Sequence, residues 1–507
     1  MRRVPALESC GIKDIVNGPI SYTPDGSPLI GPAWGLPNVW LNEGHSFGIT
    51  AAGGAGWQLA EWIVEGEPGI DMLAADPRRF GAYTSKRYVV QKNEETYRNV
   101  FTIHYPDEER PDGRPAKTSP VYDKLNARGA VWGQRYGWER ANWFAPAGVE
   151  RRDRWSFRRS NYFEHVGNEA RLMRERVGVI DLTPFTKHEV VGPGAEAWLD
   201  GLVANKVPAR IGRMALSHAL TRRGGIRSEF TITKIAEQYF YVVSAGAAER
   251  YDSDYLLKAL PKDGSVGLRN ITNTRGTFVL AGPKSREVLA QLTDTPLDNN
   301  SFPWLTAQVI EAALAVDVYA LRVNFVGALG WELHFPTEYA QGLFDALFEA
   351  GKPHGIGMVG MRAMESLRME KSYRMWGSDL TPDYTPLEAS LDRFVRMGKG
   401  PFIGREALER QLQAGIPNRF VTLEVHGVTD ADPLGNEPLF DSGGRMVGRA
   451  TSGYYGHCLR KSLAIGYVRS ALAEPGTRLT IEILGERKQA TVLRESPYDP
   501  ENLELRA

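Results

Sequence analysis

A glutamate in a strongly patterned segment is the first candidate for chemistry. Residues 330–335 read Gly-Trp-Glu-Leu-His-Phe and follow a β-rich stretch at 318–325, which predicts a hairpin. The period of two places the apolar side chains on one strand face and Glu332 on the other. A carboxylate has two coplanar acceptor oxygens, which suit two adjacent N–H groups such as those of a pterin's amino-pyrimidine edge. A solvated strand face is the alternative interpretation, because acidic side chains are seldom buried.

A second glutamate, Glu229, lies in another predicted hairpin. Residues 215–234 contain two strand-like stretches separated by a glycine pair at 224–225, and glycine is favoured in tight turns. Solvent exposure is the simple interpretation of an acid in such a hairpin. The residues alone therefore leave the role of Glu229 open.

The elements that must position these residues form an internal repeat. Residues 190–202 and 280–292 both read as strand, Gly-Pro, helix, and proline is favoured near a helix start. Amphipathic helices are predicted at 339–351 and 360–371. Two copies of one unit predict two similar α+β half-domains, with a ligand site in the cleft between them.

Composition and charge exclude several classes of protein. The 507 residues predict several domains, and the 61 basic residues equal the 61 acidic ones, so that no global field favours nucleic acid or a membrane. The arginine-rich run at 150–159 stands among mixed charges, which favours a domain-bridging loop. Two cysteines form no disulfide framework, and the nine histidines show no metal-ligand spacing. Without a secretory signal or an apolar run of about 18 residues, we expect a cytoplasmic protein, or a mitochondrial matrix protein in a eukaryote.

The segment around Glu332 resembles the G-E-x-G-[YW]-E segment of the glycine-cleavage T-protein (aminomethyltransferase) family. The resemblance is nearest to the folate-binding half of dimethylglycine and sarcosine dehydrogenases, and it implies that Glu332 holds the pterin of tetrahydrofolate. The hairpin resembles the family's L-x-x-x-G-G-x-x-D-D-x-x-V and puts Glu229 at its second acid. That position implies a catalytic carboxylate beside folate N10 and N5. A glutamate there keeps the charge but reaches one methylene further than aspartate.

The same resemblance implies further folate contacts. It aligns Ser244 with a small polar residue that touches the pterin, and Arg362 with the folate-contacting arginine of the G-x-R-A-x-x-x-L-R-x-E helix. Trp376 is expected to line the pterin pocket, with core packing as the alternative. Two acids and a tyrosine of the family are replaced here, by Ala328, Ser228 and Leu216.

The N-terminal part resembles the end of the flavin-dependent amine oxidase domain of these dehydrogenases. The similarity rests on T-P-D-G-x-P-x-x-G-P at 23–32 and G-H-S-F-G-I at 44–49. The G-x-G-x-x-G unit that takes an ADP pyrophosphate is missing, and the glycine cluster at 53–56, which opens a predicted helix at 51–65, has the wrong spacing. We expect the C-terminal part of a two-part enzyme, truncated or separately encoded, with FAD supplied only by a partner chain or a missing N-terminal half.

The resemblance implies an α+β fold in four parts. These are an amine-oxidase tail at 1–90, a connector at 91–160, a folate-binding aminomethyltransferase domain of two half-domains at 161–405, and a C-terminal β-barrel at 406–507. The implied function captures the methylene unit from oxidative N-demethylation of a dimethylglycine- or sarcosine-like amine as 5,10-methylenetetrahydrofolate. Two alternatives stay open: a free-standing tetrahydrofolate-dependent demethylase without flavin, and a non-catalytic folate-binding partner subunit of a flavoprotein.

Overall fold

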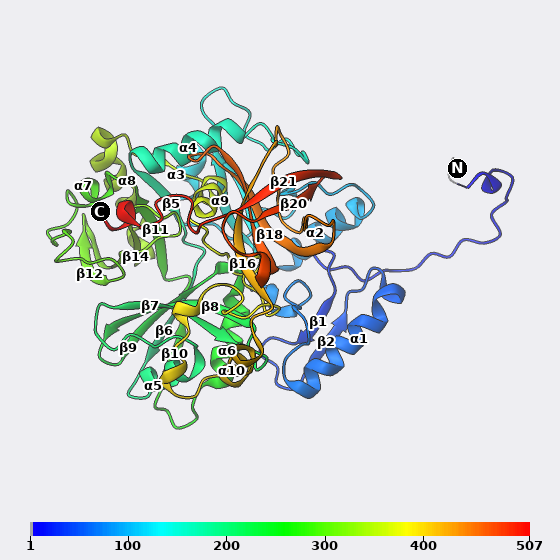
Figure 1. Cartoon of the computed structure of the whole chain (residues 1–507), viewed down its shortest axis with the longest axis horizontal. Coiled ribbons are helices and arrows are strands. Elements are labelled where there is room, and N and C mark those ends of the chain that lie inside the picture. The colour runs from blue at the N-terminus through cyan, green and yellow to red at the C-terminus, as the bar shows by residue number, and fades with distance from the viewer. Residues whose placement is uncertain (1–3) are drawn as a thin grey trace.

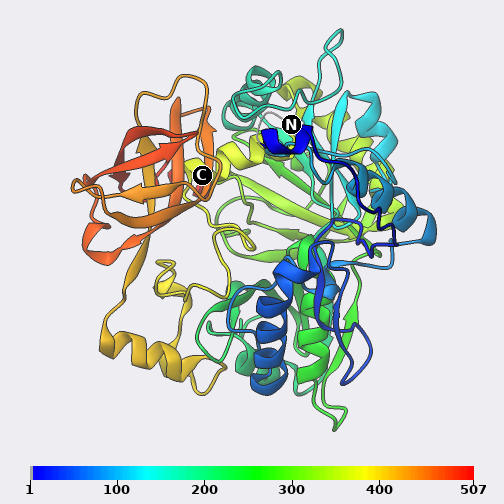
Figure 2. The ribbon, with the colours of Figure 1, turned by 90° about the vertical axis from the view of Figure 1, so that its right-hand side faces the viewer.

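The computed structural model describes residues 4–507 and shows three lobes, of which two are α+β and one is a barrel (Figure 2). The N-terminal segment, blue in Figure 1, lies beside the first α+β lobe. This arrangement confirms the predicted α+β fold with a C-terminal barrel. In the part of the chain that the structure describes, no helix is long and apolar enough to cross a membrane.

The first half-domain is a five-stranded sheet with helices packed on one face. The strand order is β10-β6-β9-β8-β7, and neighbouring strands are antiparallel. Phe230, Ile232 and Val242 form a core with Leu199 and Leu256 of the covering helices. The elements are β6 (Thr186–Val191), α5 (Ala195–Leu202), β7 (Met214–Leu220), β8 (Ile226–Ala236), β9 (Tyr239–Ser244), α6 (Glu249–Ala259) and β10 (Gly267–Asn270).

The second half-domain is a six-stranded sheet in the order β12-β13-β14-β11-β5-β15. The predicted hairpin is confirmed, because β13 pairs antiparallel with β14 and places Leu321 opposite Glu332. Trp331, Leu333 and Phe335 pack into one core with the helices of this half-domain. The elements are β5 (Gly178–Asp181), β11 (Arg275–Ala281), α7 (Ser285–Leu289), β12 (Ala307–Ala312), β13 (Ala315–Leu321), β14 (Gly330–Pro336), α8 (Ala340–Gly351) and β15 (Gly357–Met358).

The predicted repeat is present, and its two copies turn from strand to helix in the same way. Gly192 after β6 and Gly282 after β11 have φ values of 115° and 118°. An added Cβ would meet the backbone oxygen of Ser265 at 2.4 Å and that of Arg176 at 2.5 Å. Both the left-handed backbone and the close approach therefore require glycine.

The two half-domains also exchange strands. β5 precedes β6 in the chain but pairs with β11 of the second sheet. β10 precedes β11 in the chain but pairs with β6 of the first sheet. The second sheet therefore includes β5, which comes before the first sheet in the chain. The first sheet includes β10, which comes directly before β11 of the second sheet.

The C-terminal lobe is a closed barrel in the order β16-β19-β18-β17-β20-β21, as the resemblance implies. β16 also pairs with β21 and closes the ring. The helix α9 packs against β18 and so joins the barrel to the second half-domain. The elements are α9 (Met361–Glu370), α10 (Arg405–Ala414), β16 (Asn418–Val425), β17 (Pro438–Phe440), β18 (Met446–Gly456), β19 (Lys461–Arg469), β20 (Arg478–Ile483), β21 (Glu486–Leu493) and α11 (Leu503–Arg506).

The N-terminal segment forms small elements and is tied to the first half-domain through Arg78, which pairs with Asp254 of α6 at 2.6 Å. The predicted helix at 51–65 is present as α1, but its apolar face is only partly covered: Trp62 is buried and Ile63 is exposed. The elements up to the first sheet are β1 (Leu29–Pro32), β2 (Trp40–Glu43), α1 (Gly48–Glu65), α2 (Lys86–Asn99), α3 (Tyr122–Ala127), β3 (Ala130–Arg135), β4 (Trp138–Phe144) and α4 (Phe163–Glu175).

Candidate functional site

Glu332 lies on the strand face of β14 opposite its apolar neighbours, as the period of two predicts, and this is the inner face of the half-domain. Its neighbours Trp331 and Leu333 are fully buried on the helix-covered face. Glu332 lies between Val279 of β11 and Leu321 of β13, in the middle of the sheet, and it is 8% exposed. The structure therefore excludes a solvated strand face for this residue.

His334 connects Glu332 to both half-domains. Its Nε2 lies 3.2 Å from Glu332 Oε2, and its Nδ1 lies 3.0 Å from both Thr277 Oγ1 and Tyr241 Oη. Burial, with the cations of Lys187 and Arg275 nearby, holds the pKa of His334 well below its usual value, so the ring is neutral. When Glu332 is ionised it can only accept a hydrogen bond, so the ring proton is then on Nε2 and Nδ1 accepts from the hydroxyl of Tyr241 or Thr277.

Burial also shifts the charge balance around Glu332. It raises the pKa of Glu332 to about 8, against the opposing effect of the Lys187 cation. It lowers the pKa of Lys187 to about 7, against the charges of Asp181 and Glu249. The Lys187 ammonium donates to the backbone oxygens of Thr183 and Phe185 at 2.9 Å. Burial thus disfavours the charged form of both groups, and the attraction between their charges opposes this effect.

Glu229 lies on the inner face of the first sheet and is held by a histidine of the neighbouring strand. Ser228 and Phe230, its neighbours in β8, are buried, whereas the Glu229 side chain is 23% exposed. His218 of β7 stands directly opposite, and its Nε2 lies 3.0 Å from Glu229 Oε2. The two glutamates thus lie on the inner faces of different half-domains, each in contact with a fully buried histidine.

Trp376 packs against β8 near the position of Glu229. Its indole Nε1 donates to the backbone oxygen of Arg227 at 3.0 Å, two residues before Glu229. Trp376 also lines a small cavity together with Arg227 and Tyr251, beside residues 71–73 of the N-terminal segment. Its predicted contact with the pterin stays a prediction.

The other two predicted folate contacts lie in different surroundings. Arg362 of α9 is buried and donates to Asp107 Oδ2 at 2.8 Å and to Asp153 Oδ2 at 2.6 Å, with the Tyr162 ring 4.0 Å away. Ser244 is the last residue of β9, and the strand alternation places it on the helix-covered face, where its buried hydroxyl faces Asp252 of α6. The structure does not bring either residue into contact with Glu229 or Glu332.

Five residues of this cluster lie outside the predicted site residues: Lys187, His218, Tyr241, Thr277 and His334. Tyr241 and Thr277 stand between apolar residues of their strands, which is an available signal, whereas Lys187 stands between Thr186 and His188 and gives none. Their grouping depends on how the two sheets face each other, and a local pattern carries no information on that.

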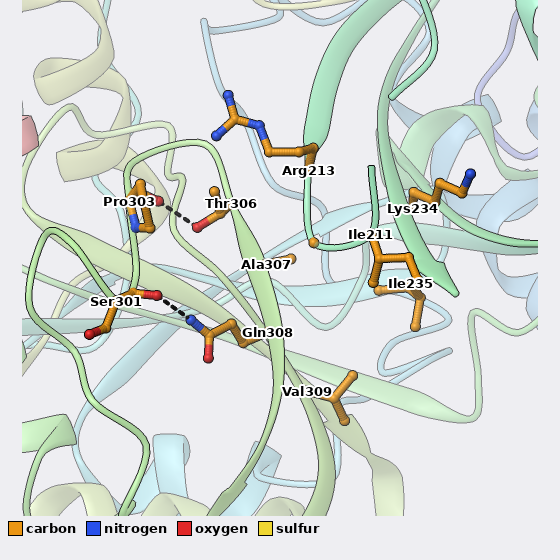
Figure 3. A pocket seen from close by; sticks show the side chains of 11 residues that line it. Ile211, Arg213, Lys234, Ile235, Ser301, Pro303, Thr306, Ala307, Gln308 and Val309 are labelled. Atoms are coloured by element: carbon orange, nitrogen blue, oxygen red, sulfur yellow. Dashed lines mark hydrogen bonds between the residues drawn. The ribbon is translucent and has the colours of Figure 1, made fainter. Parts of the chain in front are cut away.

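A surface pocket of about 450 Å³ lies elsewhere, where the edge strand β12 approaches the end of β8 (Figure 3). Its lining comes from residues 211–213, 234–235 and 301–309, and none of the predicted site residues is part of it. In Figure 3 the charged end of Lys234 points away from the side chains of Gln308 and Val309. Within residues 4–507, no group of three or more His, Cys, Asp or Glu side chains has the geometry to hold a metal ion.

Three family models match the chain along most of its length. The GCVT N-terminal domain matches residues 121–399, and the glycine cleavage T-protein C-terminal barrel domain matches residues 418–499. The FAD dependent oxidoreductase central domain matches residues 65–119. The first two matches cover the half-domains and the barrel, and the third lies in the N-terminal segment.

Individual proteins give the same result. The chain is 38% identical to mitochondrial dimethylglycine dehydrogenase of Mus musculus over 98% of this chain and 57% of that protein. It is 31% identical to mitochondrial sarcosine dehydrogenase of Homo sapiens over 99% of this chain and 60% of that protein. The chain thus spans little more than half the length of these relatives. The glycine cleavage aminomethyltransferase T of Bartonella henselae matches with a TM-score of 0.66 and 26% identity, over 76% of this chain and 98% of that one.

Proposed function

The chain belongs to the glycine cleavage T-protein family, and from this premise we propose that it transfers one-carbon units from N-methyl amines to tetrahydrofolate. The observation that carries the proposal is the placement of one glutamate on the inner face of each half-domain, each bonded to a buried histidine. Such a transfer needs an acceptor for the pterin and a proton acceptor at the reacting nitrogens. Glu332 and Glu229 are of the right type for these two tasks.

Glu332 would bind the pterin. Its carboxylate accepts one N–H from His334, and accepting sites remain for two adjacent N–H groups of the ligand. The Glu332 carboxylate is largely shielded from water, which strengthens its hydrogen bonds to the ligand once it is ionised. The nearby Lys187 cation favours that ionised form.

Glu229 would accept a proton at the reacting nitrogens. Tetrahydrofolate, when bound, supplies the nucleophilic nitrogens N5 and N10. A carboxylate close to them takes up the proton that the nitrogen loses, and the orientation of the bound partners supplies much of the rate. Trp376 lies beside this end of β8 and would line the pterin pocket.

Arg362 and Ser244 are further proposed folate contacts, although the strand alternation turns Ser244 to the helix-covered face of its sheet, away from Glu229 and Glu332. For Arg362 this role requires Asp107 or Asp153 to give way, since both now accept from its guanidinium. Asp107 is the candidate to move, because its side chain is 46% exposed and that of Asp153 is 7% exposed.

The electrophilic carbon would come from a flavin site on a partner chain or on further sequence. The N-terminal sheet within residues 4–507 is the antiparallel pair β1–β2, and such a pair does not form the parallel sheet that binds a dinucleotide. Large apolar side chains are exposed along this segment, and we infer that they contact the flavin-bearing part: Ile12, Ile15, Val16, Phe47, Ile49, Trp57, Val64 and Phe101. By similarity to the two dehydrogenases, the amine would be of the dimethylglycine or sarcosine type.

Titration calorimetry of the purified chain with tetrahydrofolate tests the binding step. A second assay supplies dimethylglycine and the flavin-bearing partner, and it measures methylenetetrahydrofolate against free formaldehyde. The expected outcome is tight binding by a colourless chain and a shift from formaldehyde to methylenetetrahydrofolate when the chain is present. The chain with both glutamates changed to glutamine is the matched control.

Three outcomes separate the alternatives. A wild-type chain that fails to bind tetrahydrofolate contradicts the proposal. Binding without any transfer favours a non-catalytic folate-binding partner of a flavoprotein. Transfer from a simple methyl donor without flavin favours a free-standing demethylase.

A further inference from the structure

The His218 side chain is fully buried and has a single hydrogen-bond partner in the part of the chain that the structure describes. Its Nε2 lies 3.0 Å from Glu229 Oε2, whereas its Nδ1 is buried without a partner. Because Nδ1 has no acceptor, the ring proton belongs on Nε2, where the carboxylate accepts it. The hydrogen bond is therefore directed from the histidine to the glutamate.

The position of the His218 ring is set by its strand and by packing. His218 and Glu229 are directly opposed residues of β7 and β8, so their side chains leave the sheet on the same face. The ring of Phe394 packs edge-on against the His218 ring, with 6.1 Å between the centroids. The ring is thus a fixed donor beside a side chain that is itself partly exposed.

Glu229 has more freedom than an aspartate at the same position, because its side chain has one more rotatable bond. A carboxylate that takes a proton from a bound ligand must be held in a narrow range of positions. The hydrogen bond from His218 holds one carboxylate oxygen and leaves the other available to a ligand. A shorter aspartate would withdraw the carboxylate from the His218 ring.

We propose that His218 is a positioning residue, which fixes the Glu229 carboxylate for proton transfer at the folate nitrogens. This inference rests on the proposed function of the same site. It assigns to the histidine no contact with folate and no proton transfer of its own. The effect of His218 on the reaction passes through Glu229 alone.

His218→Phe and His218→Gln form a matched pair of test variants. Phenylalanine keeps a ring against Phe394 but removes the N–H, whereas the amide of glutamine places an N–H donor near the position of Nε2. We expect His218→Phe to lower kcat about tenfold or more, as a slightly misplaced catalytic group does. The dissociation constant for tetrahydrofolate should stay within about twofold, and His218→Gln should recover most of the loss.

A double-mutant cycle separates positioning from general damage to the fold. With Glu229→Gln as the background, His218→Phe should change kcat by less than about twofold, because the group through which it acts is already lost. Equal losses in both backgrounds, or an unchanged kcat in His218→Phe, would overturn the proposal. Failure of His218→Gln to recover activity while its melting temperature stays at the wild-type value would do the same.

A measurement without folate distinguishes failure of this inference from failure of the proposed function. Nitrogen NMR of the histidine-labelled chain reports which ring nitrogen of His218 carries the proton, with His218→Gln as the assignment control. We expect a protonated Nε2, with a resonance that shifts in Glu229→Asp. A proton on Nδ1 alone would refute the hydrogen bond whether or not the chain binds tetrahydrofolate.

Discussion

The two half-domains share one arrangement of strands but carry different side chains at equivalent positions. The pairing registers place Tyr241 of β9 where Glu332 stands in β14, and Val243 where His334 stands. The first half-domain therefore supplies a hydroxyl that donates to His334 and no second acid at this position. The polar cluster around His334 is thus formed by the inner faces of both half-domains. The repeat gives the two faces the same backbone arrangement, and the different side chains at equivalent positions give the cluster its acid and its histidine.

A second pair of equivalent positions carries acids with different partners. The registers relate Glu229 of β8 to Asp317 of β13. Asp317 pairs with the Arg275 guanidinium, whereas Glu229 accepts from the His218 ring. Arginine is charged at all physiological pH values, so Asp317 is part of a permanent ion pair. Histidine gives a single N–H to Glu229, and the remaining oxygen of that acid stays available for a ligand.

The largest effect is expected when the two equivalent acids are changed separately. Glu229→Gln removes the proton acceptor and should slow methylenetetrahydrofolate formation by about 10²- to 10⁴-fold, while the affinity for tetrahydrofolate stays nearly unchanged. Asp317→Asn is the matched control and should leave both quantities near the wild-type values. Steady-state kinetics with the flavin partner and calorimetry measure the two quantities. A wild-type rate of methylenetetrahydrofolate formation in Glu229→Gln would show that Glu229, like Asp317, has no role in the reaction.

Changing Glu332 should weaken binding. Glu332→Gln keeps the shape but sets a donor against a pterin N–H, which costs about 1–3 kcal/mol, or about five- to 150-fold in the dissociation constant. Tyr241→Phe changes the equivalent position of the other half-domain and should leave the affinity within about threefold, because its hydroxyl contacts His334 and not the proposed ligand. Equal affinities of Glu332→Gln and wild type in calorimetry would remove the pterin role.

The contrast between Glu332 and Glu229 also shows what the sequence can predict. The period of two is local, and it correctly predicted that Glu332 lies on the strand face opposite Trp331 and Leu333, as local patterns predicted the hairpins around both acids. The contact of His218 with Glu229 depends on the register between β7 and β8, which shifts at a bulge between Ala219 and Leu220. The approach of Lys187 to Glu332 depends on the packing of one half-domain on the other. The strand exchange of β5 and β10 follows from long-range pairing, for which a single sequence gives no signal.

The pH dependence of binding should come mainly from Glu332, with a smaller opposing contribution from Lys187. Burial raises the pKa of Glu332 to about 8, and only the ionised carboxylate accepts two N–H groups. Below that pH the free chain must lose a proton to bind, so the affinity should rise with pH by up to about tenfold per unit and level off above pH 8. Lys187 loses its charge over part of this range, which makes the rise shallower.

Calorimetry in two buffers of different ionisation enthalpy should detect the release of up to one proton on binding at pH 7. Glu332→Gln provides the control and should bind with no such release. An affinity that is flat from pH 6 to 8 in the wild type would contradict the ionisation of Glu332 on binding. A similar slope in Glu332→Gln would assign the proton to another group.

The smallest effect concerns the contact that joins the half-domains at His334. Its Nδ1 has one lone pair and lies 3.0 Å from both Tyr241 Oη and Thr277 Oγ1, so that either hydroxyl can satisfy it alone. Tyr241→Phe and Thr277→Val should each lower the free energy of unfolding by about 1 kcal/mol or less. The double variant leaves a buried nitrogen without a donor, which costs about 1–3 kcal/mol, and the loss should exceed the sum of the single losses. Denaturant titration of the four proteins measures this coupling. Additive losses would mean that the two hydroxyls act independently and that His334 does not couple them.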